Sequence, residues 1–150
     1  MSEIKETDLA WAAGLFDGEG CVQIKRDYND KVNRRWTTYS LRAIVVNTHV
    51  PTLVRFKAIV GIGTIRPMAF YGAHSKKSKQ RWEWQAVSKQ AEMVLRALLP
   101  YLVTKKAQAE IALLSREYQG KIGSYRNLNK DKIEDLRVQL SELNQGRIIH

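Results

Sequence analysis

The chain has 150 residues, of which 44% are hydrophobic and 27% are charged, and this is enough for one domain with a buried core. It carries 25 Lys and Arg residues against 15 Asp and Glu residues, giving a formal net charge of +10 at pH 7. A basic excess of this size indicates a polyanionic partner, most often nucleic acid, with an ordinary basic surface as the alternative.

The cysteine count and the hydropathy exclude several classes of protein. With Cys21 as its one cysteine, the chain cannot form an internal disulfide, and its three scattered histidines leave no zinc-finger spacing. The polar, acidic start of the chain is unlike a targeting peptide, and no apolar run approaches the roughly 20 residues that span a bilayer. We therefore expect an intracellular protein that does not enter a membrane; an organelle (chloroplast or mitochondrion) and a bacterial or phage cytoplasm fit equally.

The first predicted element is a helix that is apolar on nearly every side. Thr7 or Asp8 is expected to cap its start, and it is expected to end near Phe16 or Asp17. A helix without a polar face is typical of complete burial, so we expect this one to be covered all round.

Two pairs of strands follow, separated by a short helix. Period-two alternation and β-branched or aromatic residues predict strands over residues 21–27, 36–47, 63–71 and 81–87. The helix between the pairs has Pro51 in its first turn and Gly61 at its end.

Three helices are expected after the last strand. Ser88 is predicted to cap the first of them, and Pro100 to break or kink it. A second helix is expected over 103–118, and a third begins near Asn129. The apolar face of the third helix consists of Ile133, Leu136, Leu140 and Leu143.

This order of elements predicts a single α+β domain over residues 1–150, with a core over about 7–118 and a helical extension over about 127–145. The first seven elements form an αββαββα unit, in which helices back one face of a four-stranded antiparallel sheet. The other face is then free, and we expect Gln23, Lys25, Thr38, Ser40 and Arg42 to point outward there. Such a face is a candidate nucleic-acid surface, or an ordinary solvated one.

Two acidic residues stand where the first helix is expected to end. Asp17 and Glu19 alternate with Gly18 and Gly20. Acids at a helix C-terminus are disfavoured by about 0.3–1 kcal/mol each, so helix stability does not explain them. A carboxylate at a glycine-lined turn beside a cationic surface suits a divalent metal that also contacts phosphate, although acidic glycine turns are common.

The wider stretch "AAGLFDGEG" (12–20) resembles the signature of the LAGLIDADG homing endonucleases. Five residues match this signature directly: Ala13, Gly14, Leu15, Asp17 and Gly20. Ala12 and Phe16 replace aliphatic residues, Gly18 replaces an alanine, and Glu19 stands at the second Asp, where the family accepts either acid. Segments 45–65 and 98–110 also resemble the family in order, so the resemblance covers roughly residues 9–118.

The resemblance implies a homodimer that cuts double-stranded DNA. One motif per chain implies two copies, whose motif helices pack at a two-fold axis through small residues, here Ala10, Ala13 and Gly14, while Asp17 supports the helix ends and the interface. A symmetric dimer matches a long, near-palindromic site, in which one phosphodiester of each strand is hydrolysed.

The resemblance also implies roles for individual residues. Glu19, with the backbone carbonyl of Gly18, is expected to bind Mg²⁺; Mn²⁺ or Ca²⁺ could occupy the same site. Asn47 is expected to order water near the metal, or else to open the turn into the next helix. Lys105, or Lys106 if the alignment is shifted by one residue, is expected to polarise water or to offset charge at the scissile phosphate.

The DNA contacts are expected to come from the sheet face and the basic loops. Candidates for contacts with bases are Gln23, Lys25, Thr38, Ser40, Arg42, Arg66, Arg81, Glu83 and Gln85. The facing of the fourth strand stays open, because Trp82 and Trp84 fit either side of the sheet. Candidates for contacts with phosphates are Arg34, Arg35, Lys76, Lys77 and Lys79.

Two other functions remain open on the same fold. One is a maturase that binds group I intron RNA, and the other is a DNA-binding protein that does not cut. Glu19 and Lys105 favour cleavage, because a maturase could lose them. The final helix either packs on its own domain or extends the DNA contact, and the sequence leaves both options open.

Overall fold

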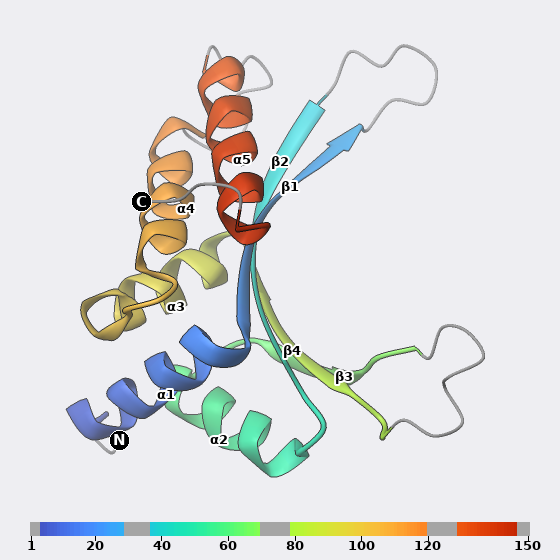
Figure 1. Cartoon of the computed structure of the whole chain (residues 1–150), viewed down its shortest axis with the longest axis vertical. Coiled ribbons are helices and arrows are strands. Elements are labelled where there is room, and N and C mark those ends of the chain that lie inside the picture. Colours follow the sequence, from blue (N-terminus) through green and yellow to red (C-terminus); the bar gives the residue numbers. More distant parts are fainter. Residues whose placement is uncertain (1–3, 29–36, 70–78, 120–128, 147–150) are drawn as a thin grey trace.

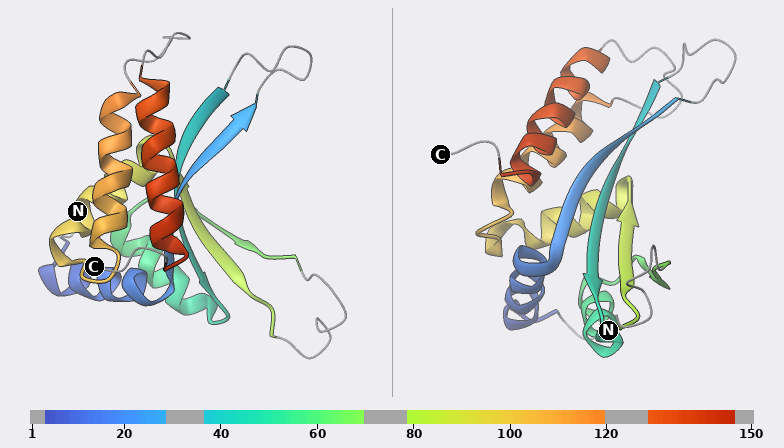
Figure 2. Two further views of the ribbon diagram at one scale, coloured as in Figure 1. Left: turned by 45° about the horizontal axis from the view of Figure 1, so that its top comes forward. Right: turned by 45° about the vertical axis from the view of Figure 1, so that its right-hand side comes forward.

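The computed structural model describes residues 4–28, 37–69, 79–119 and 129–146. Its elements are α1 (Glu6–Glu19), β1 (Gly20–Tyr28), β2 (Thr37–Asn47), α2 (Val50–Val60), β3 (Thr64–Pro67), β4 (Trp82–Val87), α3 (Lys89–Leu98), the 3₁₀ turn η2 (Leu99–Tyr101), α4 (Lys106–Tyr118) and α5 (Lys130–Asn144). The strands form one antiparallel sheet in the order β1-β2-β4-β3. The described helices lie on one side of this curved sheet (Figures 1 and 2), which confirms the α+β prediction.

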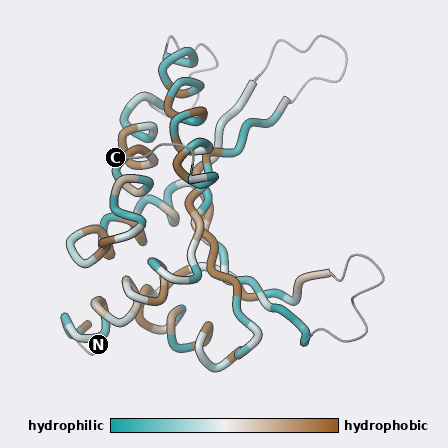
Figure 3. The backbone as a smooth tube through the Cα atoms, viewed as in Figure 1, coloured by the Kyte–Doolittle hydropathy of each residue, from teal (hydrophilic) through white to brown (hydrophobic). Residues whose placement is uncertain are grey.

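The core lies between the helices and the inner face of the sheet. At its centre the side chain of Trp84 is fully buried, and its indole N–H donates to the carbonyl of Ile62 at 3.0 Å. The ring of Phe56 meets Trp84 edge-on, with the ring centroids 4.7 Å apart. Figure 3 shows the hydrophobic stretches concentrated along the middle of the sheet and the helix turns beside it, while the far end of β1 is hydrophilic.

The burial of Trp84 decides the facing of β4. Side chains alternate along a strand, so Ala86 shares the inner face and is also buried, whereas Glu83 and Gln85 belong to the outer face. Gly63 allows the indole to sit so close to the chain: it has φ +104°, and a Cβ there would lie 2.2 Å from the indole nitrogen.

Helix α1 differs from the prediction at both ends and in its burial. It begins at Glu6 after Lys5, and no side chain caps it, so the expected caps at Thr7 and Asp8 are wrong. It continues to Glu19. Its buried residues are Ala12, Ala13 and Phe16. The expectation of burial all round is therefore wrong for the single chain, because the sheet and the neighbouring helices cover one side of α1.

The two helices that follow strands β2 and β4 agree with their predicted limits. Pro51 stands in the first turn of α2, and Gly61 ends that helix in the left-handed conformation with φ +80°. Ser88 is the N-cap residue of α3, as predicted, but its side chain makes no capping bond. Its backbone N–H instead donates to the carbonyl of Leu41 at 2.7 Å, which extends the β2–β4 pairing by one residue.

Helix α4 begins at Lys106, later than the predicted residue 103. The reason is a contact with α1. The two carboxylate oxygens of Asp17 accept the backbone N–H groups of Val103 and Lys105, each at 2.9 Å. These bonds hold residues 103–105 in a turn against the end of α1, and the helix starts only after it.

Helix α5 packs on its own domain. Ile133, Leu136 and Leu140 are buried, as predicted, whereas Leu143 is only partly buried. At the C-terminal end of the helix, the side-chain amide of Asn144 donates to the carbonyl of Val22 at 2.9 Å, which satisfies a backbone group on the edge strand β1. None of the described helices is both long and apolar enough to cross a lipid bilayer.

A carboxylate on α5 joins the helix to the two nearest strands. Glu134 accepts hydrogen bonds from Arg26 of β1 and from the Tyr39 hydroxyl of β2, both at 2.8 Å, and it pairs with Arg137 on its own helix. Hydrogen bonds from Arg137 and Tyr39, together with the positive charges of Arg137 and Arg26, lower the pKa of Glu134 to about 2. These effects outweigh burial, which alone would raise the pKa. Burial, together with the bond to Glu134, raises the pKa of Tyr39 to about 12.

Replacing Glu134 by Gln is expected to lower the free energy of unfolding by about 1–2 kcal/mol at pH 7, because Gln lacks the charge that Arg26 and Arg137 stabilise. Since the folded-state pKa lies below the ordinary value of 4.5, this contribution is complete above about pH 4.5 and is lost as the pH falls toward about 2. Urea unfolding of both proteins between pH 7 and pH 3 measures the difference.

Glu117→Gln is the matched control, because Glu117 is exposed on α4 and has no hydrogen bond or ion pair with the described residues. Its difference from the unmutated protein is expected to stay near zero. A Glu134→Gln difference that does not shrink on acidification contradicts this account.

Candidate nucleic-acid interface and metal-binding carboxylate

The outer face of the sheet gathers the polar residues that the sequence analysis proposed for base contacts. Cross-strand partners there are Gln23 with Arg42, Lys25 with Ser40, and Arg66 with Glu83. Strand alternation adds three more positions to this face: Thr38 and Gln85, with Arg81 directly before β4. No described helix covers this face (Figure 2), so eight residues from four strands, together with Arg81, share one open surface.

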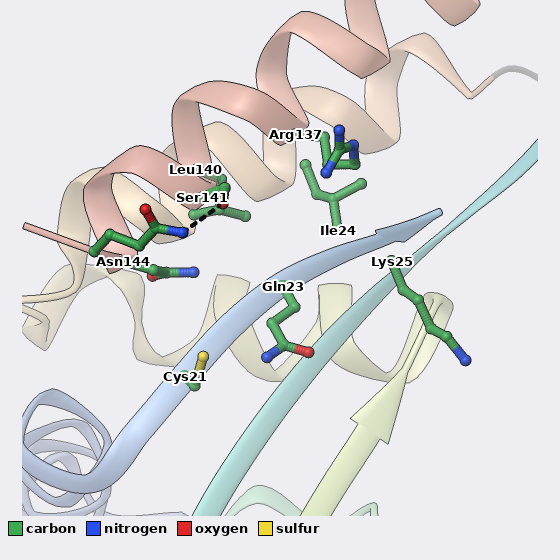
Figure 4. A pocket seen from close by; sticks show the side chains of 9 residues that line it. Cys21, Gln23, Ile24, Lys25, Arg137, Leu140, Ser141 and Asn144 are labelled. Carbon is green, nitrogen blue, oxygen red and sulfur yellow. Dashed lines mark hydrogen bonds between the residues drawn. The ribbon is translucent and has the colours of Figure 1, made fainter. Parts of the chain in front are cut away.

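Helix α5 borders this surface along β1. A cleft of about 320 Å³ separates them, lined on β1 by Cys21, Gln23 and Lys25 and on α5 by Arg137, Ser141 and other side chains. In Figure 4, Ile24 points toward α5, whereas Gln23 and Lys25 point away from it. Helix α5 therefore lies along the edge of the outer face and leaves the side chains of Gln23 and Lys25 accessible.

Glu19 is the last residue of α1, and β1 begins with the next residue. Its side chain is exposed, and it has no hydrogen bond or ion pair with any residue that the structure describes. Gly18 beside it is also exposed. Within the described ranges no three His, Cys, Asp or Glu side chains are grouped as metal ligands. One chain thus presents a single free carboxylate at the end of α1.

Asp17 has a different environment from Glu19. Its carboxylate is occupied by the N–H groups of Val103 and Lys105, so it supports the chain's own structure and is not free to bind a metal. The same bonds hold Lys105, whose side chain is partly exposed, next to the end of α1. Lys106 is the first residue of α4 and is exposed.

Asn47 ends β2, as predicted. Its side-chain oxygen accepts the backbone N–H of His49 at 2.8 Å, so it opens the turn into α2. This is the structural role that the sequence analysis left open for Asn47. The amide nitrogen of Asn47 has no bond to another described residue.

The small residues of α1 divide between two faces. Ala10, Gly14 and Gly18 are spaced by four residues and are exposed along one face. Ala13, also predicted to contact a second copy, is fully buried in the chain's own core. Of the basic-loop candidates, Lys79 is exposed. Arg34, Arg35, Lys76 and Lys77 lie outside the described residues.

The glycines of the motif differ in what their own chain requires of them. A Cβ on Gly20 would lie 2.4 Å from the carbonyl oxygen of Phe16 and 2.7 Å from the Phe16 ring. Gly14 and Gly18 have no atom within 4 Å of the Cβ position. Gly20 is therefore needed for α1 to turn directly into β1. At positions 14 and 18, by contrast, packing within the chain would also allow a larger residue.

Neither a protein-family model nor a curated protein matches the sequence. The chain has the fold of the LAGLIDADG homing endonucleases, as solved structures show. I-CvuI, in complex with a DNA target in the presence of Mg, is similar with a TM-score of 0.66 and 21% identity, over 96% of this chain and 98% of that chain. The archaeal intron-encoded I-Vdi141I, complexed with DNA, has a TM-score of 0.73 and 12% identity, over 92% and 84%. The LAGLIDADG meganuclease I-AabMI, bound to uncleaved DNA, has a TM-score of 0.67 and 17% identity, over 95% of this chain and 50% of that chain.

Gly20→Ala is expected to lower the free energy of unfolding by about 2–3 kcal/mol, because the new methyl group overlaps the Phe16 carbonyl. Gly18→Ala is the matched control: the methyl group enters open space, and alanine favours a helix by up to about 1 kcal/mol. Thermal and urea unfolding of both variants measure the effect. Equal stability of the two variants contradicts the assigned difference between the glycines.

Proposed function

We propose that the chain is a homodimeric, divalent-metal-dependent homing endonuclease that cuts double-stranded DNA at a long, near-palindromic site. The observation that carries the proposal is the juxtaposition of a free carboxylate, Glu19, with the start of an open polar sheet face. The net charge of +10 supports a polyanionic partner. The shared fold supports the same conclusion, since I-CvuI and I-Vdi141I were both solved with DNA.

The exposed face of α1 supports assembly of two copies. Ala10, Gly14 and Gly18 form a smooth stripe there, and glycine within a helix costs about 0.5–1 kcal/mol relative to alanine. Close approach of a second α1 helix gives these glycines a purpose that the single chain lacks. The match to half of the I-AabMI chain and to nearly all of the I-CvuI chain is consistent with a unit that works in pairs. A two-fold axis between the copies then accounts for a near-palindromic site.

The residues at the end of α1 suit Mg²⁺. Hard divalent cations prefer oxygen ligands, and Mg²⁺ retains several waters and binds one or two carboxylates together with substrate phosphates. Glu19 offers a free carboxylate, and Gly18 beside it leaves space for a ligand. Two copies related by a two-fold axis at α1 bring two Glu19 side chains together. When bound, the metal supplies an activated water and stabilises charge on the leaving oxygen.

Lys105 and Asn47 complete the site that we propose. Asp17 anchors the backbone of Lys105 beside α1, so the ammonium group can offset negative charge at a phosphate near Glu19. Asn47 uses its oxygen within its own turn, which leaves its NH₂ group to donate to water or phosphate. Lys79 and the basic loops contact the phosphate backbone, which adds affinity without sequence information.

Cleavage of a randomised library of DNA duplexes in the presence of Mg²⁺ tests the proposal. The unmutated chain is expected to cut both strands of a defined, near-palindromic site. Glu19→Gln is expected to bind the same site and to lose at least 100-fold in cleavage rate, because a neutral amide is a weak ligand for Mg²⁺. Glu117→Gln, which removes an exposed carboxylate from the far end of α4, serves as the matched control and is expected to cut normally.

Other outcomes separate the competing functions. Binding of a DNA site without metal-dependent cutting by the unmutated chain indicates a DNA-binding protein and overturns the catalytic proposal. Binding of group I intron RNA in place of DNA indicates a maturase. Equal cleavage by the unmutated chain and by Glu19→Gln removes Glu19 from the metal site but leaves the endonuclease proposal intact.

A further inference from the structure

Strand β4 carries two hydrogen-bond acceptors on the outer face, and each holds an arginine from a different neighbouring strand. Glu83 holds Arg66 of β3, and Gln85 holds Arg42 of β2. One residue separates the two acceptors along β4. Because β4 lies between β2 and β3, each acceptor can reach an arginine on a different neighbouring strand. Both guanidinium groups are therefore tethered on the surface that we propose for DNA.

Arg66 and Glu83 form an ion pair in which the negative charge is covered and the positive group is exposed. The two residues lie directly opposite each other in the β3–β4 register, and a nitrogen of Arg66 lies 3.1 Å from a carboxylate oxygen of Glu83. The Glu83 side chain is 11% exposed, whereas that of Arg66 is 58% exposed. The carboxylate is thus covered, and the guanidinium group faces outward with its net charge offset.

The pair of Arg42 and Gln85 differs in charge. Nη2 of Arg42 donates to the side-chain oxygen of Gln85, diagonally across from β2 to β4. Because glutamine is neutral, Arg42 keeps its full positive charge. Arginine has five N–H donors in a planar fork, so one bond to Gln85 leaves donors for a second partner.

We propose that Gln85 and Glu83 are positioning residues that hold Arg42 and Arg66 ready to read guanine in the major groove of a DNA duplex. This inference rests on the proposed function and deepens it. Arginine recognises guanine through a bidentate contact to O6 and N7, whose geometry a freely rotating side chain satisfies less often. Holding the side chain in place before binding removes part of the ordering cost. The two arginines then contribute differently to DNA binding. Arg42 keeps its charge and adds electrostatic affinity for the duplex, whereas the charge of Arg66 is offset by Glu83, so Arg66 adds discrimination between bases but little affinity.

The test is selection of binding sites from randomised duplexes by the full chain without divalent metal, followed by titrations of single-base variants. Gln85→Ala is expected to reduce the preference for guanine at one base pair of each half-site by about three- to tenfold. Its affinity for unrelated duplex and its salt dependence stay unchanged, since no charge is lost. Arg42→Ala is expected to abolish the same preference and to lower the slope of log affinity against log salt by about one.

Glu83→Ala gives an independent arm with an opposite effect on affinity. It removes both the side-chain oxygen that holds Arg66 and the charge that offsets it. Its guanine preference is expected to weaken at a second base pair, while binding to unrelated duplex becomes tighter and its salt slope steeper by about one. Gln90→Ala, at an exposed position on α3, is the matched control and is expected to behave as the unmutated chain.

The outcomes separate this inference from the proposed function. If the unmutated chain selects a duplex sequence but Gln85→Ala and Glu83→Ala keep its full guanine preference, the positioning role is overturned and the proposed function stands. The same holds if both variants weaken all duplexes equally. If the unmutated chain selects no duplex sequence at all, the proposed function and this inference are both overturned.

Discussion

The site and the sheet both depend on the passage from α1 to β1 without a loop. Glu19 ends the helix, and Gly20 begins the strand. The turn is possible only because Gly20 lacks a side chain, since Phe16 occupies the adjoining space. Asp17, in the last turn of α1, accepts two backbone N–H groups from the segment before α4. The turn therefore sets where the Glu19 carboxylate lies and also which side chains of β1 face outward.

The order of elements and the faces of the sheet could be predicted because they follow from local pattern. Apolar alternation on β1 and β2 placed Gln23, Lys25 and Arg42 on the open side, and the register agrees. The facing of β4 could not be predicted, because Trp82 and Trp84 alternate with polar residues that fit either side. The facing is decided by the hydrogen bond from the Trp84 indole to the Ile62 carbonyl, which joins residues 22 positions apart. Ile62 lies in a loop whose sequence has no repeating pattern.

The remaining differences also come from contacts between distant residues. Asp17 meets Lys105 across 88 positions, and this contact delays the start of α4. Glu134 meets Tyr39 across 95 positions, and this contact, together with Arg26, secures the tail helix to the sheet. Ala13 resembles the exposed small residues of α1 in sequence, but it lies on the face that the core covers. Within the candidate site, the motif therefore separated the metal-binding candidate Glu19 from Asp17, and the fold was needed to show which backbone groups Asp17 binds.

The central claim is that one chain provides half of a site and half of a DNA surface, so that two copies act on one duplex. The most direct measurement is the mass of the complex between the full chain carrying Glu19→Gln and a selected duplex, by sedimentation equilibrium. The account predicts two chains per duplex, bound with positive cooperativity about the centre of a near-palindromic sequence. A single chain per duplex at saturating protein contradicts it.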